Sequence, residues 1–430
     1  MASLSRRTLL AAGAVTPLAG TLNGLSGASA EPATDWPEPD DANFWSWVAT
    51  QYDTRSDIIN VENGNWGLMA RPVLDAYLAN TEKVNRENSF FARREYGAMA
   101  RDILAQVKTR LGADDNEVAL TRGATEALQN IIGGYNKLKP GDAVMMADLD
   151  YGAMMEAMRW RAEKSDCQVV NLSVPENASH DELISFYEQA FLEHPKTRFL
   201  LLTHISHRTG LMLPIREISE IAHRQGIDVV VDAAHSWGQV DFNVKDLGAD
   251  FVGFNLHKWI GAPIGVGAMY IQADRLADIS VNMSEASSDP SRIYTRVHSG
   301  TSNFAAYMTI PEAFAFQDRL ARADKFARLR LLRQIWVDEV RDVSGIDVLT
   351  PEDDRLHGGI TSFRFSGMTS SEDNQAIAAY LLEKHKVFTV HRTGVSNGAC
   401  VRVTPGYYNS AEDMQRTAKA VLDAHRHFKV

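Results

Sequence analysis

Short apolar runs alternate with amphipathic stretches along the middle of the chain. Helical stretches such as residues 155–163 and 215–226 separate these runs, and Gly226 marks the expected end of the second stretch. Short apolar runs of this kind are typical of strands that are buried on both faces. The runs cover residues 143–147, 199–205, 228–234, 251–256 and 266–271. Strands alternating with helices predict right-handed βαβ units, and therefore an α/β fold with a mostly parallel sheet.

The pattern changes near residue 311. Residues 312–340 form a long charged stretch with helical periodicity, and three shorter strand-like stretches follow at 359–365, 387–392 and 399–405. We therefore expect a large domain over residues 43–310 and a smaller C-terminal α+β domain over residues 311–430, with the boundary inside the long helix.

The first thirty residues have the features of an export signal. Arg6 and Arg7 precede a long stretch of small and apolar residues that has no acidic residue and ends in Ala-Ser-Ala at residues 28–30. The segment resembles a twin-arginine signal, which implies transport of a folded protein to the periplasm by the twin-arginine export machinery. Gly, Pro and Thr interrupt the run, which argues against a membrane anchor. Residues 31–42 are rich in Pro and acidic residues and predict a loose N-terminal arm.

Composition and charge limit the possible partners. The chain is 45% hydrophobic and 23% charged, as in an ordinary globular protein. Its net charge of −11 argues against nucleic-acid and anionic-membrane partners, because both require basic patches. The two cysteines, Cys167 and Cys400, are too few for a disulfide framework and lack metal-site spacing; they form one bridge or two separate buried thiols. His204 and His207 would point to opposite faces of a strand, which argues against a shared metal ion.

Lys258 and Asp232 are charged residues that stand at the ends of predicted buried strands, where a charge is unusual. Lys258 follows the run at 251–256, and Asp232 ends the apolar part of the run at 228–234. In an open α/β sheet, ligands bind outside the carboxyl ends of the strands, which is where both residues are expected. A pyridoxal phosphate (PLP) enzyme needs a lysine that holds the aldehyde as a Schiff base and an acid that protonates the pyridine nitrogen. Burial would also give this lysine the lowered pKa that imine formation requires.

A phosphate site can be expected where residues 119–134 pass from a strand into an amphipathic helix. Gly123, Ala124 and Thr125 stand at the predicted helix N-terminus, where backbone N–H groups bind anions. An ordinary helix cap gives the same pattern, and no nucleotide-binding loop follows because the Gly-Lys-Ser/Thr sequence is absent.

Six motifs together carry a family resemblance. TRGATEAL, THISHRTG, VVVDAAHSWGQ, FNLHKWIGAPIGVGAMY, SGTSNF and VRVTPGYYNSAEDM occur in this order from residue 121 onward. They resemble the fold-type I, class-V aminotransferase-like PLP enzymes, the group that includes isopenicillin N epimerase and the cysteine desulfurases. The resemblance implies a PLP-dependent transferase fold, with PLP as the cofactor, and extends from about residue 60 to the end of the chain.

The resemblance also implies a role for each matched position. Lys258 would carry the Schiff base and Asp232 would contact the pyridine nitrogen, with Arg402 holding the substrate carboxylate. Thr301 would reach the phosphate bound by a neighbouring subunit, which implies a homodimer. Asn65 belongs to a segment that forms either a substrate wall or a tight glycine turn with Trp66 packed beneath it. The other cofactor-binding positions are Ala124 and Thr125 at the phosphate, Tyr151 on the ring, His235 near the phenolic side, and Asn255 and His257 beside the lysine.

Two positions depart from the desulfurase pattern. His207 stands where desulfurases have the Asn that contacts the cofactor O3′, so His207 is a cofactor-binding candidate of undefined role. Asn397 stands where a desulfurase has its nucleophilic cysteine, and Cys400 is expected to be a small buried residue of the strand leading to Arg402. Sulfur transfer is therefore disfavoured.

The reaction is expected to occur at the α-amino carbon of an amino acid or short peptide that carries a free amine and a carboxylate. An exported member of this family resembles enzymes of pyoverdine maturation, which implies that the substrate is the glutamyl side chain of a siderophore precursor. An amino-acid epimerase and a carbon–sulfur lyase share the same cofactor-binding residues and remain alternatives. A further alternative is that the protein is an exported binding protein and not an enzyme. The presence of both Lys258 and Asp232 disfavours this alternative.

Overall fold

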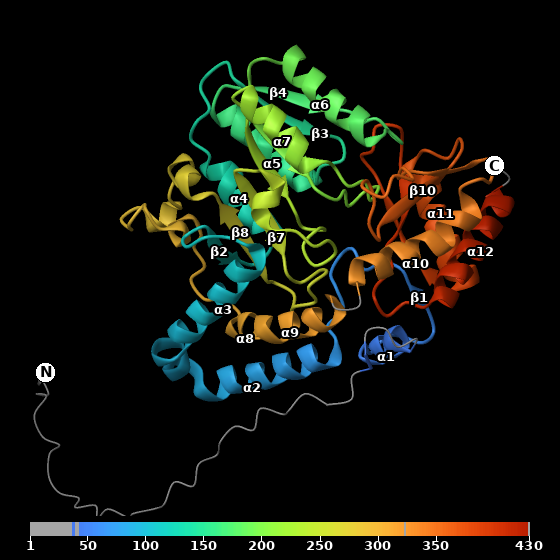
Figure 1. Ribbon diagram of the computed structural model, residues 1–430, viewed down its shortest axis with the longest axis horizontal. Coiled ribbons are helices and arrows are strands. Elements are labelled where there is room, and N and C mark those ends of the chain that lie inside the picture. Colours follow the sequence, from blue (N-terminus) through green and yellow to red (C-terminus); the bar gives the residue numbers. More distant parts are fainter. Residues whose placement is uncertain (1–36, 39–42, 322–323, 429–430) are drawn as a thin grey trace, which may run out of the picture. The chain divides into compact units, whose positions relative to one another are not determined.

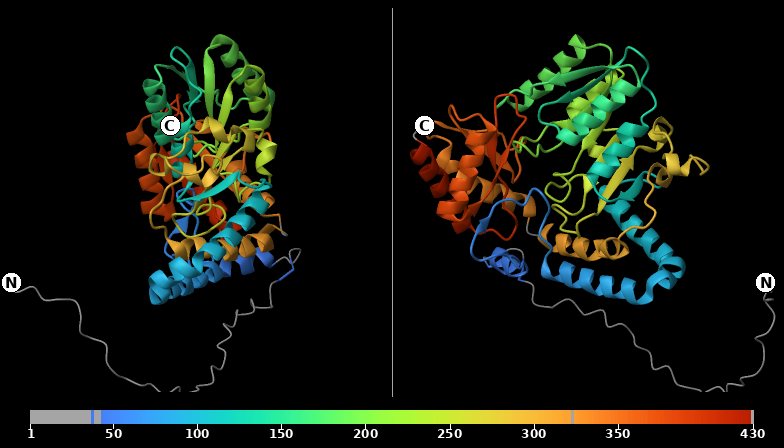
Figure 2. Two further views of the ribbon diagram at one scale, coloured as in Figure 1. Left: turned by 90° about the vertical axis from the view of Figure 1, so that its left-hand side faces the viewer. Right: turned by 180° about the vertical axis from the view of Figure 1, so that it is seen from behind.

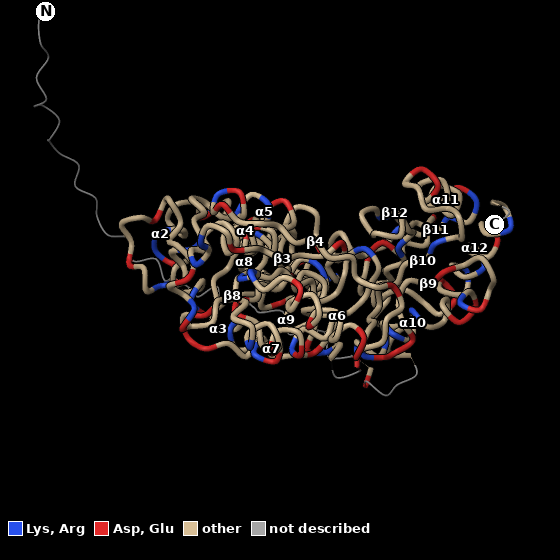
Figure 3. The backbone as a smooth tube through the Cα atoms, turned by 90° about the horizontal axis from the view of Figure 1, so that it is seen from above, with Lys and Arg blue, Asp and Glu red and all other residues tan. Residues whose placement is uncertain are grey.

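The computed structural model describes residues 37–38, 43–321 and 324–428. The predicted export signal and almost all of the predicted arm lie outside the described residues. From residue 38 onward the described chain forms one compact unit, so the domain boundary expected within the long helix stays a prediction. Among the described helices, none is long and apolar enough to cross a membrane. Acidic and basic residues are interspersed along the described backbone (Figure 3).

The large sheet confirms the expected mostly parallel arrangement. Seven strands of the described chain follow the order β2-β8-β7-β6-β5-β3-β4, and β8 is antiparallel to both of its neighbours while the other pairs are parallel. The strands are β2 (Val118–Thr121), β3 (Ala143–Ala147), β4 (Gln168–Leu172), β5 (Thr197–Thr203), β6 (Asp228–Asp232), β7 (Phe251–Asn255) and β8 (Gly267–Ile271). All five apolar runs therefore coincide with strands, within a few residues at their ends.

Helices cover both faces of this sheet (Figures 1 and 2). Helices α4 (Ala124–Gly134) and α5 (Gly152–Lys164) bury their apolar faces in one core cluster with side chains of β3, β5, β6, β7 and β8. Helix α7 (Ile215–Arg224) contacts β6, packs against α6 (His180–Glu193) and contributes nothing to that cluster, so it lies on the opposite face. Gly226, with φ of +69°, follows the end of α7 as expected.

A group of helices packs at the lower edge of the large sheet in Figure 1. Helix α2 contacts α3, α8 and α9, and α3 also contacts β2. These helices are α2 (Arg71–Arg94), α3 (Tyr96–Leu111), α8 (Phe304–Met308) and α9 (Ile310–Ala321). The short helical elements are α1 (Phe44–Thr50) and the 3₁₀ turns η1 (Val244–Leu247), η2 (Ala273–Asp278), η3 (Met283–Glu285) and η4 (Ile293–Arg296).

The C-terminal part has its own antiparallel sheet and its own core. Its sheet order is β12-β13-β10-β9, and α10, α11 and α12 bury apolar side chains against it. In the view from behind in Figure 2, this part stands beside the large sheet. The elements are β9 (Ile346–Val348), β10 (Thr361–Phe365), β12 (Val390–Arg392), β13 (Cys400–Val403), α10 (Lys325–Val340), α11 (Ser371–His385) and α12 (Ala411–Phe428).

One predicted element is wrong. The stretch at residues 312–340 is divided between two helices, α9 and α10, instead of forming one. Asp324 caps α10 with its side chain accepting from the Ala327 N–H, and its φ of +49° is incompatible with a continuous helix. The two helices also pack differently, because α9 contacts α2 and α3 whereas α10 contacts α12 and β9.

The N-terminal segment joins the C-terminal part. Strand β1 (Ile59–Asn60) pairs in parallel with β11 (Val387–Phe388), and Glu62 forms a separate parallel bridge to Thr404, which follows β13. The Asn63 side chain donates to the carbonyl of Thr404 at 3.0 Å. The residues that follow, 64–67, are thereby held against the end of the large sheet.

Candidate active site

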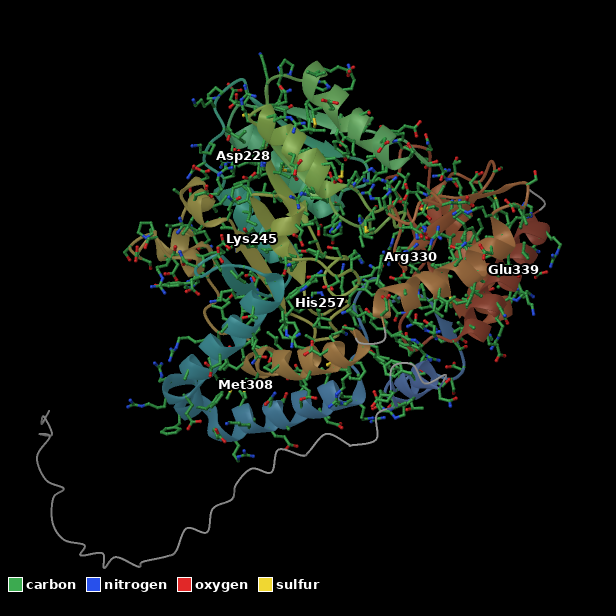
Figure 4. All side chains as sticks on the ribbon, in the orientation of Figure 1. Asp228, Lys245, His257, Met308, Arg330 and Glu339 are labelled. Carbon is green, nitrogen blue, oxygen red and sulfur yellow. The ribbon has the colours of Figure 1, made fainter. Side chains whose placement is uncertain are left out.

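The carboxyl ends of β6 and β7 position the two predicted catalytic residues. Asp232 is the last residue of β6 and Asn255 the last of β7, and these parallel strands are direct neighbours with Asp232 opposite Gly253. Lys258 lies in the turn that follows β7. Figure 4 shows the adjacent His257 between the large sheet and the C-terminal part. The fold therefore brings Lys258 and Asp232 together, as expected from the sequence.

The Lys258 side chain is partly buried, and its amine is hydrogen-bonded to one histidine. Its Nζ lies 2.9 Å from Nε2 of His235, and the indole N–H of Trp259 donates to Nδ1 of the same ring at 3.4 Å. Because Nδ1 accepts, the proton of a neutral imidazole lies on Nε2 and points to the amine. Burial lowers the pKa of Lys258 to about 8, and burial also holds the pKa of His235 well below its usual value. The pair therefore favours an uncharged amine.

Two buried carboxylates lie behind this amine. Asp232 is 6% exposed, and its Oδ1 accepts from the backbone N–H of Ala234 at 2.9 Å. Burial raises the pKa of Asp232, while the nearby Lys258 charge opposes that rise. Asp150 accepts from the Thr203 hydroxyl at 2.7 Å, and burial, reinforced by the charge of Asp232, raises its pKa to about 7. Asp232, which ends β6 and is removed from water, can therefore pair with a basic ring nitrogen of a ligand.

The N-terminus of α4 faces the same region, but one of its amides is already used. The N–H of Ala124 donates to Oδ1 of Asn255 at 2.7 Å, so Asn255 fixes the helix end to β7. The His257 ring lies within 3.3 Å of the position that a Cβ on Gly123 would take, and its Nδ1 donates to the carbonyl of Val266 at 3.0 Å. Thr125 also lines the cavity at this helix end, where its hydroxyl can donate to an anion.

Tyr151 and His207 form the outer wall. Tyr151 is the N-cap of α5 and is 42% exposed, and its ring meets His207 edge-to-face with centroids 5.3 Å apart. Burial holds the pKa of His207 well below its usual value, and its Nδ1 has no hydrogen-bond partner among the described residues. The partly exposed Tyr151 ring is thus available to a planar ligand, and His207 lines the cavity beside it with one buried nitrogen that lacks a described partner.

Arg402 forms an ion pair with Glu62, a residue that was not predicted to belong to the site. Its Nη2 donates to both carboxylate oxygens of Glu62, at 2.6 and 2.7 Å, and its Nη1 donates to the carbonyl of His207 at 2.6 Å. Arg392 lies 3.2 Å from the same carboxylate. Burial, with the neighbouring Arg402 charge, lowers the pKa of Arg392 to about 10, which leaves it charged at neutral pH. Two guanidinium groups and one carboxylate thus share this corner.

Residues 64–67 form a wall of the site instead of a closed turn. The N–H of Gly67 donates to the carbonyl of His257 at 2.8 Å, and a Cβ on Gly67 would lie 1.9 Å from the carbonyl oxygen of Lys258. Only glycine permits this approach. Trp66 is 50% exposed, so the interpretation with Trp66 packed beneath the turn is wrong. Asn65 lines the cavity, and its expected role in binding substrate stays a prediction.

These residues enclose a cavity of about 780 Å³, within the usual range for cofactor and ligand sites. Thr301 is exposed and does not line it, so its expected role toward a neighbouring subunit stays a prediction. The predicted residues that line the cavity are Asn65, Ala124, Thr125, Tyr151, His207, Asp232, His235, Asn255, His257, Lys258 and Arg402. Thr203, Arg208 and Arg392 also line it and were missed from the sequence. Arg392 begins the RTG segment, where it could have been noticed.

The residues present fit PLP. A partly buried amine of lowered pKa, a strand-end carboxylate and a helix N-terminus meet at one cavity, and the buried His207 Nδ1 has no described partner. Lys258 can bond the aldehyde carbon, Asp232 can pair with the ring nitrogen, and the end of α4 can receive the phosphate.

Neither cysteine is placed for sulfur chemistry at this site. Both are free thiols, which excludes the disulfide alternative between them in this structure. Cys400 is fully buried in β13, and burial raises its pKa to about 11. Cys167 is only partly buried and lies beside Lys139, whose carbonyl accepts from its thiol at 3.2 Å. His204 packs edge-to-face on Phe242, whereas His207 lies in the cavity.

Comparison with known proteins identifies the fold first. Cysteine desulfurase from Thermococcus onnurineus NA1 matches with a TM-score of 0.74 at 20% identity, over 89% of this chain and 98% of that chain. A C-DES variant with glycine covalently linked to its PLP cofactor matches with a TM-score of 0.75 at 20% identity, over 87% and 98%. The α/β architecture is therefore that of the cysteine desulfurase structures.

The family follows from the sequence comparison. The model of the family Aminotransferase class-V matches residues 71–417. Isopenicillin N epimerase from Streptomyces clavuligerus is 26% identical over 389 residues, covering 85% of this chain and 94% of that protein. The chain belongs to the class-V aminotransferase family and is a PLP-dependent enzyme of that family.

Proposed function

We propose that this enzyme acts at the carbon that bears the amino group of an amino-acid moiety. The observation that carries the proposal is the Lys258 amine, which is partly buried, bonded to His235 and shifted to a pKa of about 8 at the floor of the cavity. An amine with this pKa is a nucleophile and a proton acceptor close to neutral pH, whereas an exposed lysine is neither.

The residues have distinct tasks in this reaction. When bound, PLP supplies an electron sink for bonds at the amino-bearing carbon. Lys258 would hold the cofactor until the substrate amine takes its place, and the released Lys258 amine would then move a proton to or from that carbon. The His235 N–H orients the Lys258 amine, and Asp232 holds a proton on the cofactor's ring nitrogen. Tyr151 covers the cavity and restricts the access of water.

Sulfur transfer to a protein thiol is not favoured. The buried Cys400 has a raised pKa and contacts the carbonyl of Arg208 with its thiol, so it is a packed side chain and a poor nucleophile. Epimerisation is the second candidate, because the likeness to an isopenicillin N epimerase extends over 94% of that protein. A carbon–sulfur lyase is supported by similarity of fold and by sequence similarity over a shorter part of this chain.

We also propose a substrate larger than a free amino acid, namely the glutamyl side chain of a pyoverdine-type siderophore precursor, with the enzyme acting as a periplasmic homodimer. Asn65 and Arg392 line both the main cavity and a neighbouring one of about 350 Å³ with Trp66 and Phe388 in its wall, which gives a larger molecule room. The proposed location rests on the twin-arginine resemblance of Arg6 and Arg7, and the dimer on the position of Thr301.

Absorption spectra of the purified protein and of its Lys258→Ala variant test the enzymatic proposal. We expect a near-ultraviolet to violet cofactor band in the wild type that is lost or altered in the variant, and a covalent pyridoxyl adduct after borohydride reduction of the wild type only. Turnover of a pyoverdine precursor, compared with racemisation of free amino acids, separates the two candidate reactions. A protein that stays colourless after PLP is added would be a non-catalytic binding protein instead.

A further inference from the structure

The corner of the cavity around Glu62 contains one carboxylate and two guanidinium groups. We propose that Glu62 is a specificity-determining residue that occupies Arg402 permanently and directs the substrate carboxylate to Arg392. This inference rests on the proposed function only in requiring a substrate that carries a carboxylate. It changes the role of Arg402 from a substrate-binding residue to a positioning residue for Glu62 and His207.

Arg402 has no free pair of N–H groups for a second carboxylate. Its Nη2 serves both oxygens of Glu62, and its Nη1 serves the carbonyl of His207. The backbone of Gly64 lies against the guanidinium, since a Cβ on Gly64 would be only 2.4 Å from Nη2. Bidentate recognition of a carboxylate needs two parallel N–H donors, which this guanidinium does not offer.

Displacing Glu62 from Arg402 would be costly. The side chain of Glu62 is 6% exposed and that of Arg402 is 1% exposed, so solvent does not screen their interaction. The backbone holds Glu62 in place, because it bridges to Thr404 and its N–H donates to Oδ1 of Asn60 at 3.0 Å. A substrate carboxylate that displaced Glu62 from Arg402 would leave the Glu62 carboxylate buried, with only Arg392 to balance its charge.

Arg392 is more accessible to a substrate than Arg402. Its side chain is 28% exposed, against 1% for Arg402, and its Nη2 donates one hydrogen bond to Glu62, at 3.2 Å, where Nη2 of Arg402 donates two shorter ones. It lines both the main cavity and the neighbouring one. Both arginines are near Lys258, because the charge of each contributes to the lowered pKa of that amine. The three side chains have a combined charge of +1, which one substrate carboxylate neutralises.

Paired ligands test the inference on the holoenzyme. L-Alanine and ethylamine differ in the carboxylate, and the binding of each is followed by the change in the cofactor absorption. We expect Arg392→Gln to weaken L-alanine by about 10-fold to 100-fold, which corresponds to loss of one charged hydrogen-bonding group, and to leave ethylamine within about twofold. Glu62→Gln should strengthen L-alanine by roughly threefold or more, because a negative charge beside the ligand is removed.

A matched control is available where the segment after β4 meets β10. Glu176 and Arg364 form another largely buried carboxylate–guanidinium pair at 3.1 Å, and neither lines the cavity. Glu176→Gln should leave the ratio of L-alanine to ethylamine affinity unchanged. Weaker or unchanged L-alanine binding in Glu62→Gln, or unchanged L-alanine binding in Arg392→Gln, would overturn the inference.

A crystal structure of the wild-type protein soaked with maleate, with and without PLP, does not depend on the folding of any variant. A maleate carboxylate on Arg392, with Glu62 still on Arg402, supports the inference. Maleate on Arg402 with Glu62 displaced, or on neither arginine, overturns it. Because maleate needs no cofactor chemistry, this result is separate from the proposed function, which fails if the protein does not form a cofactor adduct at Lys258.

Discussion

Strands β6 and β7 have a polar cluster at each end, and the two clusters differ in how completely their polar groups are paired. At the amino ends, Arg275 pairs with Asp228, Asp250 and Asp278, and His223 and Tyr135 complete the network. At the carboxyl ends lie Asp232, Asn255 and the turn that carries Lys258. Figure 4 shows Asp228 and His257 at opposite ends of this part of the sheet.

The cluster at the amino ends is closed on itself. Burial alone would lower the pKa of Arg275, but its hydrogen bonds to Asp228 and Asp278 and the charges of Asp250 and Asp228 raise it above the ordinary value. The hydrogen bond to Asp250 likewise raises the pKa of His223. At the carboxyl ends, burial lowers the pKa of Lys258, and His207 and Arg392 each keep an unpartnered nitrogen within the described structure. Complete pairing indicates a structural cluster, and incomplete pairing indicates a ligand site.

Replacing Asp232 by Asn should abolish function without unfolding the protein. The amide still accepts from the Ala234 N–H, but it cannot hold a proton on the cofactor's ring nitrogen, so turnover should fall by roughly 10²-fold to 10⁴-fold. The free energy of unfolding should change by less than about 1 kcal/mol. Steady-state kinetics and urea unfolding of the same sample measure both quantities. Activity within fivefold of the wild type would contradict the assignment of Asp232.

Replacing Arg275 by Met should have the opposite result. Three carboxylates would be left beside a neutral side chain, so we expect a loss of about 3–5 kcal/mol in the free energy of unfolding, measured by urea denaturation. Turnover per folded molecule should be unchanged, because Arg275 lies at the far end of the strands. A stable variant with reduced turnover would mean that the two ends are coupled.

The pH dependence of cofactor attachment sharpens the contrast further. With a pKa of about 8, the Lys258 amine is protonated below that pH and neutral above it, and only the neutral form attacks the aldehyde. The rate of PLP attachment to the apoprotein should therefore rise up to about pH 8 and then level off. A rate that kept rising to pH 10, as for an exposed lysine, would contradict the burial of this amine. Stopped-flow absorbance provides the measurement.

An exposed ion pair gives the smallest effect. Arg216 and Glu220 are one turn apart on α7 at 3.1 Å, with more than half of each side chain exposed. Arg216→Ala should change the free energy of unfolding by less than about 0.5 kcal/mol and leave cofactor binding as it is. A larger loss would show that charge on α7 supports the closed cluster at the neighbouring Asp250.

The strands and the central residues of the site could be predicted from local sequence. Buried parallel strands need continuous apolar runs, and their carboxyl ends are where a ligand site must lie, so Asp232 and Lys258 followed from position alone. The division of residues 312–340 into two helices could not be predicted in this way, because the charged stretch keeps its periodicity through the break. That break depends on what each half packs against.

The role of Glu62 was also out of reach. Its partner Arg402 is 340 residues away in the sequence, and a single sequence contains no sign of that pairing. The same holds for Asn255, which reads as part of the lysine turn but instead ends β7 and holds the Ala124 amide. Both residues act through contacts between distant segments, whereas local patterns predict only local structure.

The pairing of β1 with β11 has a consequence for how the enzyme is made. Residues 59–67 leave the ribosome early, yet their hydrogen-bond partners at Lys386, Phe388 and Thr404 are among the last to be synthesised. The growing chain can build the large sheet before then, but it cannot complete the substrate corner. Translation must therefore be almost finished before an amino-acid ligand can be held, so a nascent or truncated chain lacks a functional binding site.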